Sequence, residues 1–150
     1  MINLSVDTRN LSPSLSEKDL EIILTEMINL VEYSFDVNVE DIEGDNSYWI
    51  ETPEDEIEEL ELFGIIEIGE DQCAFQKIIS LTHETGHAIY HSDPYFKTND
   101  NTLFRESLAW YLGYHFMAEH GYTIDPEYYD QDVARAIYLY VKSENTKDQK

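Results

Sequence analysis

Residues 72–92 read QCAFQKIISLTHETGHAIYHS, and this stretch decides the fold that we expect for the chain. Its apolar residues recur at the three- and four-residue spacing of an α-helix. They are Phe75, Ile78, Ile79, Leu81, Ala88 and Ile89. A helix with apolar residues on several faces is buried in a globular protein. We therefore predict a central, buried helix that begins near residue 72 and ends near residue 91, before loop formers at 92–94.

Two histidines stand four positions apart within this predicted helix. Residues with this spacing lie on one helix face, with about 6 Å between their Cβ atoms. Both imidazoles can therefore reach one zinc ion at about 2.0–2.1 Å. Glu84 lies beside the first histidine, where its carboxylate can touch a water on the metal without becoming a ligand. The sequence predicts a zinc site with His83 and His87 as ligands and Glu84 as the general base.

A catalytic zinc site needs a third protein ligand and an open position for water. We favour Glu106, which follows His87 by 19 positions and lies early on a predicted helix over residues 103–119. Ala109 and Gly113 share its helix face, and small side chains there let two helices approach closely. The sequence thus predicts that Glu106 reaches the same zinc ion.

Asp93 is the alternative third ligand. It lies ten positions after His83, as the third ligand does in the metzincin pattern. That pattern also needs a glycine at position 90, where this chain has Tyr90, and a downstream methionine turn, which we do not find. We therefore favour Glu106. His91 is expected to be a polar cap at the helix end, or to support the metal ligands without binding the metal itself.

The other patterns place these two helices in an α+β fold of one domain over residues 1–150. A helix is predicted from an N-cap at Ser16 to about residue 33, and another from Pro126, with Asp125 as its N-cap. Three strands are predicted, over residues 35–39, 47–52 and 60–68. Two terminal segments are expected to lie outside the fold, a loose lead-in over 1–13 and a frayed tail over 143–150.

The composition limits the partners and the compartment. Acidic residues number 32 against 9 basic ones, a net charge of −23, which repels nucleic acid and anionic lipid. We expect neither as a partner. Cys73 is the only cysteine, and we expect it to be a buried, inert thiol. No apolar run resembles a signal peptide or a membrane span, so we expect a cytoplasmic protein.

At these residues the chain resembles the gluzincins, zinc peptidases with an HExxH helix followed by a glutamate helix. The likeness extends to their minimal members, including the ImmA/IrrE-type peptidases. Residues 83–87 match the HExGH helix of these peptidases, and Glu106 with Ala109 matches the E-x-x-A pattern of their glutamate helix. The likeness covers about residues 60–119. The chain departs from the family at Thr85, where leucine or isoleucine is usual, and in the four residues after Ala109.

The resemblance implies a zincin-like fold with an N-terminal helix, a small, mostly antiparallel three-stranded sheet, the two metal helices and a C-terminal helix. It implies a zinc metallopeptidase that hydrolyses protein or peptide substrates by a zinc-activated water. It also implies a substrate peptide held by strand addition along an edge strand, which we expect to be Leu60–Ile68.

In the expected mechanism zinc lowers the pKa of a bound water, and Glu84 passes the proton of that water to the leaving amine. Gluzincins commonly add a tyrosine or histidine that stabilises the oxyanion. Five residues are candidates for this role: Tyr111, Tyr114, His115, Tyr129 and Tyr140. Trp110 and Met117 are expected to be packing residues.

A second hypothesis comes from the charge of the chain. A protein with a net charge of −23 can be a non-catalytic binder that blocks a basic partner protein, with zinc kept for structure. A structural zinc site normally has four protein ligands and no open position. The coordination sphere of the metal therefore separates the two hypotheses.

Overall fold

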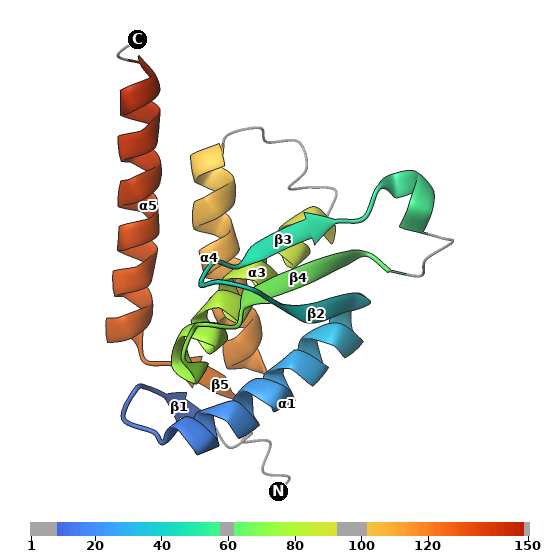
Figure 1. The fold of residues 1–150 in the computed structure, drawn as a ribbon, viewed down its shortest axis with the longest axis vertical. Helices are drawn as coiled ribbons and strands as arrows, with labels where there is room; N and C mark the ends of the chain where they lie inside the picture. The colour runs from blue at the N-terminus through green and yellow to red at the C-terminus, as the bar shows by residue number, and fades with distance from the viewer. Residues whose placement is uncertain (1–8, 58–61, 93–101, 149–150) are drawn as a thin grey trace, which may run out of the picture.

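A computed structural model describes residues 9–57, 62–92 and 102–148 (Figure 1). Within these ranges the fold is α+β, with four α-helices, a mixed three-stranded sheet and a short two-stranded sheet. The elements are, in chain order, β1 (Arg9–Leu11), α1 (Glu17–Phe35), β2 (Val37–Ile42), β3 (Tyr48–Glu51), η1 (Glu54–Glu56), β4 (Gly64–Gly69), α3 (Ala74–Ser92), α4 (Thr102–Glu119), β5 (Tyr122–Ile124) and α5 (Pro126–Asp148).

The three-stranded sheet has the order β2-β4-β3, and α1 and α3 pack against it and against each other (Figure 1). β4 pairs in parallel with β2 and antiparallel with β3. The expectation of a mostly antiparallel sheet was therefore wrong, because β4 enters between two strands that precede it in the chain. Ile66 and Ile68 of β4 are almost completely buried, which favours the central position.

The expectation that Leu60–Ile68 forms the edge strand was also wrong. Residues 60 and 61 lie outside the described ranges, and the strand that follows them, β4, is central. The strand beside α3 at the sheet edge is β3.

Helix α1 begins as its local sequence predicts. The side chain of Ser16 accepts a hydrogen bond from the backbone N–H of Asp19, at 3.1 Å, and so caps the helix. The buried face of α1 repeats at helical spacing and joins the core with Leu20, Ile23, Leu24, Met27 and Val31.

Both predictions for the chain ends were wrong within the described residues. Arg9–Leu11, expected to be loose, forms β1 and pairs in parallel with β5, because Leu11 and Ile124 are buried side by side in the core. The expected tail after residue 142 continues as helix to Asp148, because no glycine or proline follows Pro126. Asp125 caps this helix by accepting from the N–H of Glu127 at 3.0 Å.

Cys73 is exposed, so the expectation of a buried thiol was wrong. It lies immediately before α3, where its carbonyl accepts a bond from the N–H of Lys77 at 2.9 Å. No helix in the described part of the chain combines the length and apolar character needed to cross a bilayer.

Helices α3 and α4 approach so closely that two glycines are required at their crossing. A Cβ atom placed on Gly86 would lie 1.7 Å from the carbonyl oxygen of Ala109, and one on Gly113 would lie 1.9 Å from that of Thr82. Real Cβ atoms do not make contacts below 3.0 Å. The expectation that small residues bring these helices together is confirmed at Ala109 and Gly113, and Gly86 completes the contact from α3.

We expect Gly86→Ala and Gly113→Ala each to lower the free energy of unfolding by about 1–3 kcal/mol, because the added methyl group forces the helices apart. Urea denaturation measures this effect. Gln76→Ala, at an exposed position of α3, serves as the control and should change stability by less than about 0.5 kcal/mol. Wild-type stability in both glycine variants would contradict the close packing.

Candidate metal centre

The side chains predicted to bind and use zinc meet in one cleft of about 410 Å³ between α3, α4 and β3. The residues that line the cleft are Ser47, Tyr48, Trp49, His83, Glu84, His87, His91, Arg105 and Glu106. Of the residues proposed as ligands or base, the structure therefore brings His83, Glu84, His87 and Glu106 together. Asp93, the alternative ligand, lies outside the described residues.

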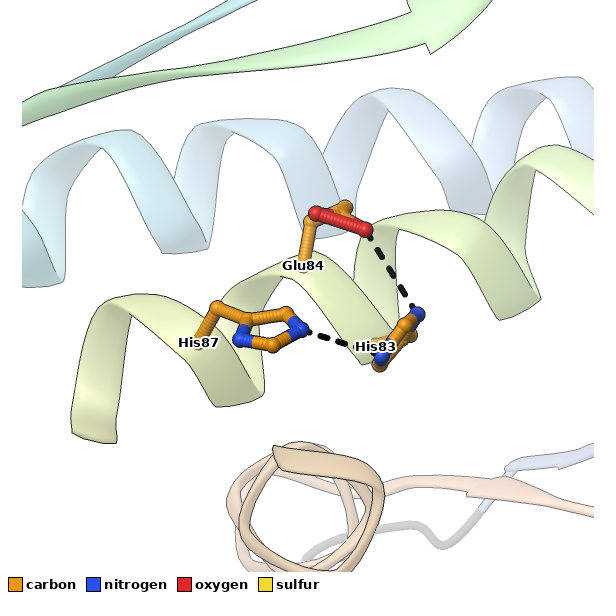
Figure 2. A group of neighbouring side chains, drawn as sticks. All are labelled: His83, Glu84 and His87. Atoms are coloured by element: carbon orange, nitrogen blue, oxygen red, sulfur yellow. Dashed lines mark hydrogen bonds and ion pairs between the residues drawn. The ribbon is translucent and has the colours of Figure 1, made fainter. Parts of the chain in front are cut away.

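The two histidines point their Nε2 atoms toward each other and toward Glu106. The Nε2 atoms of His83 and His87 lie 3.2 Å apart. Oε2 of Glu106 lies 3.0 Å from Nε2 of His83, and Oε1 lies 3.2 Å from Nε2 of His87. Figure 2 shows the two rings side by side on α3, with dashed lines that join His83 to His87 and to Glu84. Three donor groups from two helices thus surround one point.

The spacing of these donors fits a small tetrahedral cation. Two ligands at about 2.0–2.1 Å from a tetrahedral zinc ion lie about 3.3–3.4 Å apart. The three separations between donor atoms, 3.0, 3.2 and 3.2 Å, are slightly shorter than this. A small outward movement of the three side chains would therefore make room for the ion. Two imidazole nitrogens with one carboxylate are also a common donor set of catalytic zinc.

Two carboxylates compete on geometry for the third ligand position. Ligand atoms of His83, Glu84 and His87 all lie within 4.8 Å of one another, so this group could also hold a metal ion. Glu84, however, lies on the other side of the His83 ring, with its Oε1 atom 3.5 Å from Nδ1. The Glu106 carboxylate faces both Nε2 atoms at a shorter distance. The Glu106 carboxylate is therefore better placed than that of Glu84 to be the third ligand of a metal ion held by the two histidines.

The protonation of the site follows from burial and from the histidine–glutamate contacts. Burial raises the pKa of Glu84, and the charges on His83 and His87 offset only part of this rise. Burial alone would raise the pKa of Glu106, but hydrogen bonds to the two histidines lower it well below its ordinary value. Burial alone would lower the pKa of His87, yet its hydrogen bond to Glu106 and the charge of Glu84 raise it. A metal ion that binds through His87 competes with a proton there, and the raised pKa strengthens this competition.

Trp110 contributes to the site in a way that the sequence did not reveal. It is only 6% exposed, as expected for a packing residue, but its ring lies flat against His83, with centroids 3.9 Å apart and planes 4° from parallel. The hydroxyl of Tyr129 donates to the backbone carbonyl of Trp110. Trp110 follows Glu106 by one helical turn, which was the available signal for this contact. Met117 is fully buried and packs in the core.

His91 lies in the cleft wall and contacts β3. Its Nδ1 atom is 3.4 Å from Oε2 of Glu51, and its ring is stacked near Trp49, with centroids 6.0 Å apart. Sequence reasoning also missed Ser47, Tyr48 and Trp49, because only the pairing of β3 with β4 brings them to α3. Arg105 was missed although it directly precedes Glu106.

The candidates for oxyanion stabilisation do not line this cleft. Four of them, Tyr111, Tyr114, His115 and Tyr129, line a separate cavity. Tyr140 lies on α5 and is not among the cleft residues. The expectation that one of these five stabilises an oxyanion therefore has no support from their positions.

Comparison of the chain with protein-family models, with curated proteins and with solved structures found no match. The cleft itself is therefore the basis for assigning a function.

We expect a divalent metal ion to raise the free energy of unfolding, by about 2.7 kcal/mol at a hundredfold excess over its Kd. His87→Ala should abolish this increase, whereas His120→Ala, at an exposed histidine just after the end of α4, should preserve it. Thermal denaturation with and without metal measures both. The stabilisation should shrink as the pH falls, because protons compete for His87. An equal increase in the His87→Ala variant would exclude this site.

Proposed function

We propose that this chain is a zinc-dependent metallopeptidase of the gluzincin type, with zinc bound by His83, His87 and Glu106. The observation that carries the proposal is the convergence of two Nε2 atoms and one carboxylate at separations of 3.0–3.2 Å. This arrangement uses three protein ligands among the described residues, which leaves a fourth position for solvent or substrate. The α+β fold with an HExxH helix beside a glutamate helix is consistent with a zincin-like fold.

When bound, zinc would supply Lewis acidity that makes a water molecule more acidic and polarises the scissile carbonyl. Glu84 would accept a proton from the water as its oxygen forms a bond to the carbonyl carbon. It would then deliver that proton to the amine nitrogen as the C–N bond breaks. Burial raises the pKa of Glu84, which makes its carboxylate a stronger base.

The edge of β3 supports a peptide as the substrate. Among the described residues β3 has a partner strand, β4, on one side only, and Ser47, Tyr48 and Trp49 line the cleft. An extended peptide that pairs with the other edge of β3 would pass beside the metal ligands. We therefore assign the strand addition to β3 instead of Leu60–Ile68.

Glu84→Gln should keep zinc and lose peptide hydrolysis by about a hundredfold to ten-thousandfold, because it removes the general base and no ligand. Zinc content from atomic absorption and cleavage of casein or a peptide library measure the two properties. Glu119→Gln, an exposed glutamate on α4, is the matched control and should retain both. Full activity in the Glu84→Gln protein would refute the assigned base.

Glu106→Ala should weaken zinc binding by about tenfold or more, because it removes one of three ligands. Asp93→Ala should leave the affinity unchanged. Calorimetric titration of the metal-free proteins with zinc compares the two variants. The reverse ranking would move the third ligand to Asp93 and the site to the metzincin pattern.

The same measurements separate this proposal from the acidic binder with a structural zinc. A fourth protein ligand in a zinc-loaded structure, together with no cleavage of any peptide, would favour the binder. Cleavage that depends on Glu84 would exclude it.

A further inference from the structure

A second cavity, of about 230 Å³, lies between α4 and α5 and is not used by the proposed reaction. Its walls contain five aromatic or imidazole rings and one carboxylate. The lining residues are Ser107, Trp110, Tyr111, Tyr114, His115, Tyr129, Asp130 and Val133.

The aromatic walls of this cavity are held in place by packing. The rings of Tyr114 and Tyr129 have centroids 5.0 Å apart, and Tyr129 meets Trp110 edge to face at 5.4 Å and 74°. The hydroxyl of Tyr129 donates a hydrogen bond to the backbone carbonyl of Trp110. Tyr111, by contrast, is 59% exposed, so its ring is accessible at the rim. The cavity is thus preformed on one side and open on the other.

Asp130 gives the cavity a negative charge. It is the only carboxylate in the lining, and no salt bridge to it occurs within the ranges that the structure describes. Burial raises the pKa of both Tyr114 and Tyr129. For Tyr114 the charge of Asp130 adds to this rise in pKa, and for Tyr129 the neighbouring Tyr114 and then Asp130 add to it. Both hydroxyls therefore stay neutral. The chain as a whole carries a charge of −23 and raises the local concentration of cations.

We propose that this cavity binds the alkylated ammonium head group of an organic cation. Aromatic faces attract such a cation through their π-electron density, and quaternary ammonium groups are recognised by aromatic cages. An anion would be repelled by Asp130. A guanidinium group has five N–H donors, and a single carboxylate among aromatic walls satisfies few of them. A quaternary ammonium group has no donor to satisfy and so fits this lining better.

Choline and dimethylbutanol, its neutral analogue with carbon in place of nitrogen, test the proposal on the full chain. We expect choline to bind about fivefold or more tightly than the analogue, because only choline gains the attraction to the rings and to Asp130. Titrations followed by NMR shifts of the Tyr111 and Trp110 ring protons give both affinities. Equal affinity for the two compounds, or no saturable shift with either, would overturn the proposal.

Variants locate the binding to this cavity. Tyr111→Leu and Asp130→Asn should each weaken choline binding about threefold to tenfold. Both positions are exposed, so the variants should fold, which circular dichroism checks. Tyr138→Leu, at a tyrosine on α5 that is 64% exposed and does not line the cavity, is the matched control and should bind as wild type does. Unchanged affinity in both cavity variants would place the binding elsewhere and refute the assignment.

A peptide with one trimethyllysine distinguishes the two sources of this head group. Tighter binding of the peptide than of choline would identify the ligand as a protein segment, and the reverse order would identify a small molecule. Either order supports the cavity as an ammonium site. The test does not depend on peptidase activity, so it stands whether or not the chain cleaves peptides.

Discussion

The backbone contact between α3 and α4 is the constraint on which the candidate metal centre depends. His83 and His87 come from one helix and Glu106 from the other, and only a very close crossing lets a glutamate side chain reach both rings. Gly86 and Gly113 make that crossing sterically possible. The site is therefore assembled by the close packing of the two helix backbones.

The candidate metal centre concentrates charged groups in a buried place, which a folded protein tolerates only when the charges compensate each other. Glu106 is balanced by two imidazoles, and these contacts outweigh the effect of burial on its pKa. The charges of His83 and His87 offset the burial of Glu84 less completely, so the effect of burial is the larger one and the pKa of Glu84 rises. Two glutamates on neighbouring helices thus acquire opposite properties, one suited to holding a cation and the other to carrying a proton.

Local signals predicted much of this molecule, and long-range pairing accounts for what they missed. Ser16, Asp125 and the apolar repeat of α3 act within one or two helical turns, so the helices could be located from the sequence. The insertion of β4 between β2 and β3, and the pairing of β1 with β5, join segments far apart in the chain. Nothing local marks such pairings. Glu106 could be chosen by its spacing from His87, whereas the only signal for the stacking of Trp110 on His83 was its place one helical turn after Glu106.

The position of the two tryptophans gives this protein a built-in optical probe. The chain contains only Trp49 and Trp110. Trp49 lies in the wall of the metal cleft, while Trp110 touches His83 and also borders the cavity beside α5. The tryptophan fluorescence of the molecule therefore reports only on the surroundings of the cleft and the cavity, because the rest of the fold contains no tryptophan.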